Sequence, residues 1–164
     1  LLIEAHRRMR LRWPLVVVGD APYAGDYIAR LRAAAGRDVR MPGYVFGEGY
    51  AELVHRCGIM CVPTEVGGTH PVIVEAMAAG AALLVSDHPP NVETVGNSSG
   101  TFPLAGGAAA LAEALDALAA DPARRQELGA RAAERVRGRY SWDACADAYL
   151  RLCEIVTAGR AQPS

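Results

Sequence analysis

Short apolar runs and longer amphipathic stretches follow one another along the first two thirds of the chain. Each apolar run, too short for a helix and bounded by glycine, proline or polar residues, predicts a buried strand. Each longer stretch, with apolar residues three or four positions apart, predicts a helix. The predicted strands cover residues 15–19, 39–41, 59–62, 82–86 and 100–103. The predicted helices that alternate with them cover residues 1–12, 23–35, 48–56, 71–79 and 91–95.

The last third of the chain carries helical periodicity alone. We expect one helix over residues 108–119, a second that Asp121 caps and that runs to about residue 137, and a third over residues 142–156 that Ser141 caps. These helices are predicted to form a terminal helical hairpin. Strands that alternate with helices predict an α/β fold, a Rossmann-like doubly wound parallel sheet followed by a C-terminal helical segment.

Composition narrows the possible classes of protein. The 164 residues, 51% of them hydrophobic, are predicted to form a single domain over residues 1–164 with its own core. The net charge of -1 argues against nucleic acid as a partner. Because every basic residue is arginine, a Walker-type triphosphatase and Schiff-base chemistry are excluded.

Cysteine usage and hydropathy bear on the compartment and on metal binding. The four cysteines lack Cys-x-x-Cys spacing and are expected to be buried free thiols: Cys57, Cys61, Cys145 and Cys153. No signal peptide or run of eighteen apolar residues occurs, so a cytoplasmic location is expected. No Asp-x-Asp motif or His/Cys cluster has metal-ligand spacing, and we expect no metal and no cofactor.

The segment over residues 63–80 is the most informative part of the chain. Gly67 and Gly68 lie in a turn between a strand and a helix, where glycine lets the backbone approach a ligand closely. The helix that begins near His70 directs unpaired N–H groups toward that turn, which favours phosphate. Glu75 follows among apolar residues, where a charge requires a partner, and we predict that it takes a pair of hydroxyls. The alternatives are an ordinary surface turn and an idle helix carboxylate.

Two further glycine-bearing turns follow the first and second predicted strands, at Gly19–Asp20 and at residues 43–47. In a doubly wound sheet, ligands sit at the carboxyl ends of the strands, so the three turns are expected to gather there. Asp20 could contact a ligand or cap the next helix, and Tyr44 and Phe46 could flank a ligand or pack as a lid.

Two histidines lie near the third turn, and we expect different roles for them. His70 could hydrogen-bond a phosphate or a sugar hydroxyl from the start of the helix, or it could cap that helix. His88, beside two prolines, is expected to be a loop residue without a role. For Glu93, helix capping or a structural salt bridge is favoured over a catalytic role.

Five segments together resemble the C-terminal domain of glycosyltransferase family 4. They are Val18–Asp20, Gly43–Val45, Val62–Thr64, Glu75–Gly80 and Ser86–Asp87 through Glu93–Gly96. Their order and spacing match over nearly the whole chain, and the regions 121–125 and 139–142 resemble the ending of that family. The resemblance implies that the chain is one half of a GT-B fold, a nucleotide-sugar (donor) binding domain from a longer two-domain protein.

What the resemblance implies about function is a retaining transfer from a nucleoside diphosphate sugar to a saccharide or glycolipid acceptor, without a metal. The match to Glu75 binds the ribose hydroxyls. In the family, the glycine turn and the start of the following helix hold the diphosphate. The matching residues of this chain are Gly67, Gly68, Thr69, His70 and Val72. Backbone near the match to Tyr44 and Val45 meets the base. Gly19 and Asp20, in the turn after the first strand, are further candidate binding residues. A missing N-terminal half would bind the acceptor and make any peripheral contact with a membrane, so this domain alone is expected to bind but not to catalyse.

The chain departs from the family pattern at one glutamate. The family has a first glutamate eight positions before the second, and counting back from Glu75 lands on Gly67. Either Glu65, the nearest acid, reaches the donor sugar from a rebuilt loop, or that contact is lost. Glu65 and His70 are the candidate catalytic residues. The resemblance also implies that the arginine and lysine that clamp the diphosphate in this family lie upstream of Leu1. Independently, the first residues are predicted to form a helix without an N-cap, which suggests a piece of a longer protein.

Two rival functions remain open at this point. A sugar-nucleotide epimerase can be built on the same two-domain fold, although its acid and base residues are not evident here. A degenerate donor-like domain could instead serve as an interaction module, since the first glutamate of the family is displaced. The nucleobase, the sugar, the acceptor and the oligomeric state leave no side-chain signature in the sequence.

Overall fold

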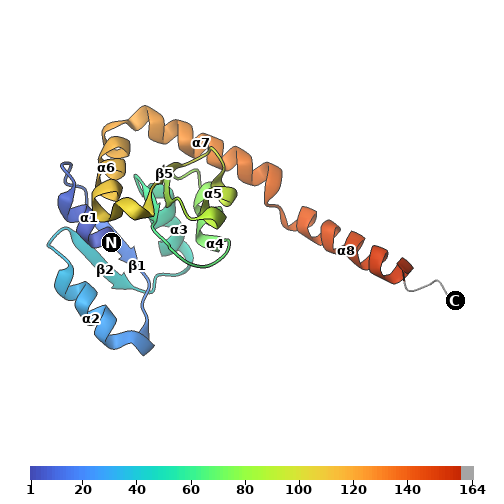
Figure 1. Cartoon of the computed structure of the whole chain (residues 1–164), viewed down its shortest axis with the longest axis horizontal. Helices are drawn as coiled ribbons and strands as arrows, with labels where there is room; N and C mark the ends of the chain where they lie inside the picture. The colour runs from blue at the N-terminus through green and yellow to red at the C-terminus, as the bar shows by residue number, and fades with distance from the viewer. Residues whose placement is uncertain (160–164) are drawn as a thin grey trace.

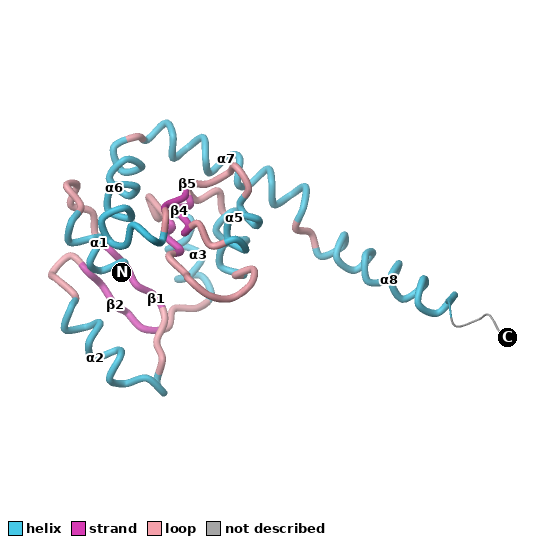
Figure 2. The backbone as a smooth tube through the Cα atoms, viewed as in Figure 1, coloured by secondary structure: helices cyan, strands magenta, loops and turns pink. Residues whose placement is uncertain are grey.

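Residues 1–159 are described by a computed structural model, in which helices surround two small parallel sheets (Figures 1 and 2). The strands are β1 (Leu15–Val18), β2 (Val39–Gly43), β3 (Met60–Val62), β4 (Leu83–Ser86) and β5 (Gly100–Phe102). The helices are α1 (Leu2–Arg8), α2 (Gly25–Ala34), α3 (Gly47–Arg56), α4 (Pro71–Ala78), α5 (Pro89–Val95), α6 (Gly107–Ala120), α7 (Pro122–Arg139) and α8 (Trp142–Gly159). Short 3₁₀ turns cover Pro22–Ala24 and Leu104–Gly106.

The predicted α/β class and the order of elements are confirmed. The strands are divided between two sheets, β1–β2 and β3–β4–β5, and all pairs are parallel. Within residues 1–159 no strand joins the two sheets by hydrogen bonds. One face of β1 is exposed, since Val16 and Val18, two positions apart, are 41% and 40% exposed.

Helix α4 and strand β4 lie at the centre of one of the two core clusters. All four residues of β4 are buried, as expected for a parallel strand that is covered on both faces. The inner face of α4 is fully buried through Ile73, Ala76 and Met77. Because these positions repeat at helical spacing, Glu75 on the opposite side of the helix is turned outward, while Val72 and Val74 on its flanks are half-buried against the same cluster.

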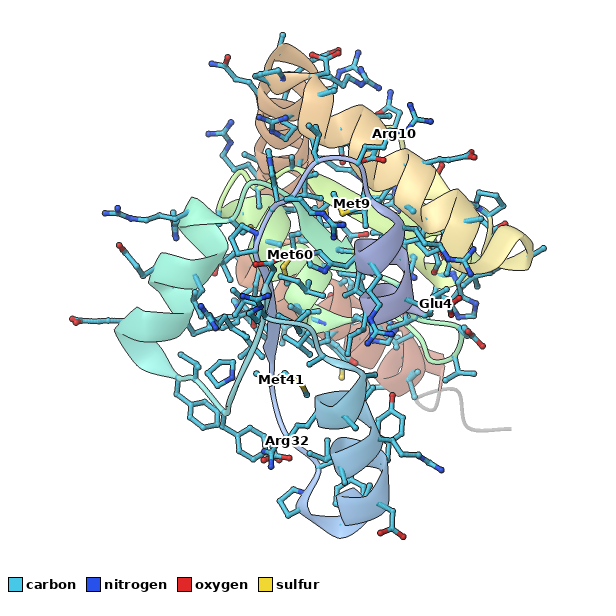
Figure 3. All side chains as sticks on the ribbon, turned by 90° about the vertical axis from the view of Figure 1, so that its left-hand side faces the viewer. Glu4, Met9, Arg10, Arg32, Met41 and Met60 are labelled. Atoms are coloured by element: carbon cyan, nitrogen blue, oxygen red, sulfur yellow. The ribbon has the colours of Figure 1, made fainter. Side chains whose placement is uncertain are left out.

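The second core cluster lies beneath α1 and α6. Met9 follows α1 and is buried, whereas Arg10 lies beside α6 (Figure 3). The backbone N–H groups of Arg10 and Leu11 donate to the Asp116 carboxylate of α6 at 3.0 and 3.2 Å. The predicted helix over residues 1–12 therefore ends early, at Arg8, because the chain turns to meet Asp116.

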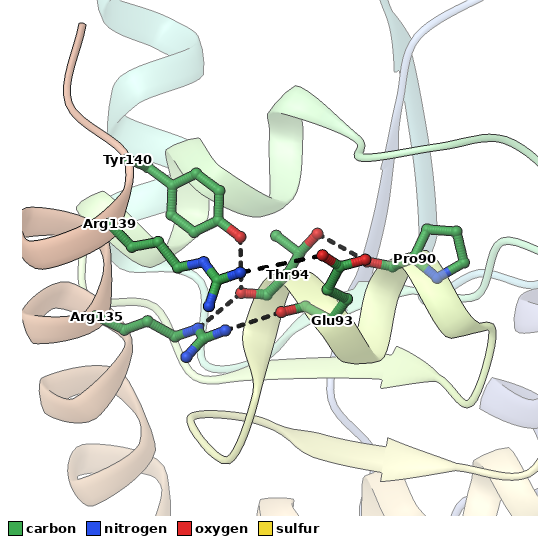
Figure 4. Close-up of polar contacts among 6 residues, drawn as sticks. All are labelled: Pro90, Glu93, Thr94, Arg135, Arg139 and Tyr140. Carbon is green, nitrogen blue, oxygen red and sulfur yellow. Dashed lines mark hydrogen bonds and ion pairs between the residues drawn. The ribbon is translucent and has the colours of Figure 1, made fainter. Parts of the chain in front are cut away.

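The C-terminal end of α5 is held by side chains from α7 (Figure 4). Arg135 donates to the carbonyl oxygens of Glu93 and Thr94, each at 2.8 Å, which satisfies acceptors that a helix end leaves free. Arg139 lies 4.0 Å from the Glu93 carboxylate. Of the two structural alternatives for Glu93, helix capping and a salt bridge, the ion pair is the one observed, between exposed side chains.

Helix α8 extends away from the rest of the molecule (Figure 1), and the predicted terminal hairpin is wrong. Tyr140 ends α7 in a non-helical conformation, and the Ser141 hydroxyl accepts a hydrogen bond from Ala144 at 3.0 Å, so a new helix starts in another direction. The two predicted caps, Asp121 and Ser141, are confirmed. Large apolar side chains on α8 remain in solvent, such as Trp142 at 90% exposed and Tyr149 at 67%.

The expectation of four buried thiols holds only in part. Cys57 and Cys61 are half-buried, and burial raises the pKa of Cys61 to about 12. Cys145 and Cys153 are exposed, because they lie on α8, which does not pack against the domain. All four are free thiols.

Helix α7 crosses the end of α4 at a distance that excludes a side chain. A Cβ atom at Gly129 would lie 2.1 Å from the carbonyl oxygen of Gly80. We expect Gly129→Ala to lower the free energy of unfolding by about 1–3 kcal/mol, because the helices must move apart. Chemical denaturation measures this change.

The matched control is Gly138→Ala in the same helix, where a Cβ atom would meet nothing within 4 Å. This variant should lose no stability, since alanine favours a helix over glycine by roughly 0.5–1 kcal/mol. Equal stability of the two variants would contradict close packing at Gly129.

Candidate functional site

The first two glycine-bearing turns are in direct contact. The Gly19 N–H donates to the Gly43 carbonyl at 2.8 Å, and the Tyr44 hydroxyl donates to the Asp20 carbonyl at 2.8 Å. Both turns follow parallel strands, β1 and β2, at the same sheet edge. The prediction that these turns gather is confirmed for this pair.

The Asp20 carboxylate is engaged within its own strand–helix unit. It accepts a hydrogen bond from the Ala21 N–H at 2.8 Å and lies 3.8 Å from the Arg32 guanidinium of α2. It also lines an open cavity of about 480 Å³ together with Pro22, Ile28 and Arg32. Neither the 3₁₀ turn at Pro22–Ala24 nor α2 receives a side-chain cap, so the capping alternative for Asp20 is not observed, and its role toward a ligand stays a prediction.

The loop that follows β2 presents an aromatic surface. Tyr44 and Phe46 stack with ring centroids 5.8 Å apart and an interplanar angle of 16°. They are 54% and 79% exposed, while Val45 between them is half-buried. The pair is therefore an open platform and not a packed lid, and a planar ligand could stack on it.

The third turn depends on Gly67. Its φ angle of +106° lies in the region that favours glycine, and Gly68 and Thr69 beside it are exposed. The His88 side chain reaches the turn from the start of α5, with Nε2 3.0 Å from the Gly67 carbonyl oxygen. His88 lies in the loop before α5, as expected, and its side chain comes close to the turn because β4 pairs with β3, which brings the loop after β4 alongside.

His70 lies at the N-cap position of α4 but makes no side-chain capping bond. Its ring packs against the turn, since a Cβ atom at Gly67 would lie 3.1 Å from Cε1. Its buried Nε2 has no hydrogen-bond partner in the described part of the chain. The capping alternative for His70 is therefore not observed, and the Val72 N–H at the second position of α4 lies at the open end of the helix.

A cluster of hydrogen-bonded polar residues holds the start of the loop that carries the third turn. The Ser86 hydroxyl donates to the Thr64 carbonyl at 2.5 Å, and Asn91 Nδ2 donates to the Thr64 and Ser86 hydroxyls at 3.0 and 2.9 Å. Ser86 and Asn91 are fully buried. These bonds tie the end of β3 to β4 and α5, so the turn starts from a fixed position.

Glu75 lies on the outer face of α4 and is exposed. Tyr50 of α3 donates its hydroxyl to Glu75 Oε2 at 2.5 Å. Burial, and then the hydrogen bond and the charge of Glu75, raise the pKa of Tyr50 to about 12. The predicted need for a partner is thus met by a neutral donor, and the carboxylate can accept further hydrogen bonds.

Glu65 is exposed in the loop that precedes Gly67. Among residues 1–159 it makes no side-chain hydrogen bond or ion pair. It shares the loop with the turn, and its contact with a donor sugar stays a prediction.

The structure adds two residues that sequence reasoning did not select. Tyr50 contacts Glu75, and His88 contacts Gly67. The adjacency of parallel strands could have suggested His88, whereas no local pattern marks Tyr50. In residues 1–159 no group of three His, Cys, Asp or Glu side chains is placed to hold a metal ion. In the same part of the chain, no helix has the length and apolar character needed to cross a membrane.

Curated relatives of the chain are mannosyltransferases. It is 35% identical over 133 residues to the phosphatidyl-myo-inositol mannosyltransferase of Mycobacterium leprae (strain TN), covering 77% of the chain and 35% of that protein. It is 31% identical over 174 residues to the protein of the same name from Mycobacterium tuberculosis (strain CDC 1551 / Oshkosh), covering 99% of the chain and 44% of that protein. The chain spans less than half the length of these relatives.

Solved structures share the fold. Sucrose-phosphate synthase from Thermosynechococcus elongatus superposes with a TM-score of 0.82 at 24% identity, over 96% of this chain and 42% of that one. Anabaena Alr3699/HepE in complex with UDP and glucose superposes with a TM-score of 0.80 at 19% identity, over 96% and 44%. At these identities the likeness concerns the fold, which is that of one half of a GT-B glycosyltransferase.

A family model described as "Glycosyl transferases group 1" matches residues 1–121. The match covers all five strands and the glycine turn before α4. The expected resemblance is confirmed, and the chain belongs to the group 1 glycosyltransferase family.

Proposed function

We propose that the chain is the donor-binding domain of a retaining glycosyltransferase, which binds a nucleoside diphosphate sugar for transfer to a saccharide or glycolipid acceptor. The observation that carries this proposal is helix α4, which presents an open glycine turn at its start and an outward carboxylate at Glu75 on its flank. The turn suits phosphate and the carboxylate suits a pair of hydroxyls, so one helix spans the polar parts of a nucleotide sugar.

The diphosphate would lie at the start of α4. Gly67, Gly68 and Thr69 leave the turn open, and the Val72 N–H and the positive end of the helix dipole point toward it. The unpartnered Nε2 of His70 is a further polar group at this position. These groups would supply part of the anion stabilisation that a leaving diphosphate requires, and a basic clamp from a second domain would supply the rest.

The base would lie on the side of β1 and β2. Backbone groups at Tyr44 and Val45 follow β2 directly, and the exposed rings of the 43–47 loop provide a surface for stacking. Gly19 and Asp20 complete this side because they are bonded to the same loop. Base, ribose and phosphates would then follow the ends of successive strands.

The chemistry would be a matter of positioning and charge. The acceptor attacks the anomeric carbon from the face that the diphosphate leaves, and no protein nucleophile is needed. We assign Glu65 to the donor sugar and His70 to the phosphates or a sugar hydroxyl as candidate catalytic residues. A second domain would supply the acceptor site and the basic clamp, so the isolated domain would bind and not catalyse.

Two findings on related proteins support a hexosyl donor. The curated relatives are named mannosyltransferases, and the Anabaena neighbour was solved with UDP and glucose. A nucleoside diphosphate hexose fits the proposed order of groups along α4.

Replacing the carboxylate tests the ribose assignment. Glu75→Ala should weaken the binding of a nucleoside diphosphate by about 10–100-fold, because hydrogen bonds to a charged group contribute roughly 1.5–3 kcal/mol. Calorimetric titration with UDP, GDP, ADP and TDP measures the loss and identifies the base.

The matched control is Glu113→Ala, which removes the same charge from the exposed face of α6. Its affinity should equal that of the unmodified protein. Unchanged affinity in Glu75→Ala would sink the ribose assignment, and no binding by the full-length protein would favour the interaction module.

Removing the support of the glycine turn tests the phosphate assignment. His88→Ala should weaken a nucleoside diphosphate by about 2–10-fold, since a neutral hydrogen bond contributes roughly 0.5–1.5 kcal/mol. The corresponding nucleoside, which lacks phosphates, should bind as before. His55→Ala on the exposed face of α3 is the control. If His88→Ala weakened the nucleoside and the nucleoside diphosphate equally, His88 would not act through the phosphate site.

A further inference from the structure

Tyr50 lies between the aromatic loop at residues 43–46 and Glu75 of α4, the two parts of the candidate site. It is the fourth residue of α3, a helix that starts immediately after the aromatic loop at residues 43–46. Its hydroxyl crosses to α4 and donates to Glu75 Oε2. One short helix therefore connects the loop that would meet the base with the carboxylate that would meet the ribose.

The ring of Tyr50 is anchored. It is partly buried and packs against the core cluster that contains Val54 and Ile73. A packed tyrosine ring has few rotamers to lose, whereas an exposed glutamate on a helix surface has many. Because the Tyr50 ring is packed against the core, its hydrogen bond restricts the rotamers that the Glu75 side chain can adopt.

The Glu75 carboxylate can still accept further hydrogen bonds while it is bonded to Tyr50. Two ionised oxygens offer about four acceptor sites, and the Tyr50 hydroxyl uses one of them. A pair of vicinal hydroxyls can still donate to the remaining sites. Tyr50 stays a neutral donor up to high pH, because its pKa is raised to about 12, and so it adds no negative charge beside a diphosphate.

We infer that Tyr50 is a positioning residue that holds the Glu75 carboxylate in the orientation that receives the 2′- and 3′-hydroxyls of a ribonucleotide. This inference rests on the proposed function, because it takes Glu75 to bind ribose. It goes further in assigning part of the selectivity for ribose to a residue outside the glycine turn and α4. An oriented carboxylate loses less conformational freedom when the ligand arrives, which increases affinity for that ligand alone.

The test compares Tyr50→Phe with the unmodified full-length protein, since this change removes a single hydroxyl. Calorimetry would use the nucleoside diphosphate that the protein binds and its 2′,3′-dideoxy counterpart. We expect Tyr50→Phe to weaken the ribonucleotide by about 3–10-fold and to leave the dideoxynucleotide within about twofold. Tyr27→Phe, on the exposed surface of α2, should change neither affinity.

Each other outcome overturns a different statement. If Tyr50→Phe weakens both ligands equally, the role of Tyr50 is structural and the inference is wrong. If it weakens neither, the hydrogen bond does not position the carboxylate for ribose. If the unmodified protein itself fails to prefer the ribonucleotide, the ribose assignment of Glu75 falls, and the inference falls with it.

Discussion

The close packing of α4 is the constraint on which the candidate site depends. Its inner face is buried without residual exposure, and its last turn meets α7 where only glycine fits. A helix that is fixed on one face and at one end has no freedom to rotate, so the residues on its outer face point in one direction. Glu75 faces outward because Ile73, Ala76 and Met77 face inward.

The turn before α4 combines a rigid base with an open surface. Beneath it, Ser86 and Asn91 are fully buried and hydrogen-bonded to Thr64, while Gly68 and Thr69 above are exposed. The hydrogen bonds of these buried donors favour one arrangement, because another arrangement would leave the Ser86 hydroxyl and Asn91 Nδ2 unpaired. The exposed backbone at the turn thus starts from a position that hydrogen bonds fix.

Periodicity in the sequence was enough to predict the elements, since each apolar run or stripe is a local property that burial enforces. It also predicted that Gly67 lies in a turn before a helix that carries Glu75, and the structure has this turn and helix. It did not predict the division of the sheet, the direction of α8, or the partners Tyr50 and His88. Those features depend on which elements lie side by side in space, and a local pattern carries no information on such neighbours.

The division into two sheets has a consequence for local stability. Helix α2 and strand β1 have no buried residue, whereas β4 is buried throughout. Amide hydrogens in β1 and β2 would therefore exchange with solvent through smaller openings than those in β4, which require disruption of the core. The part of the protein beside Tyr44 would be the more dynamic one, and a molecule that touches both sheets would slow exchange in the first sheet far more than in the second.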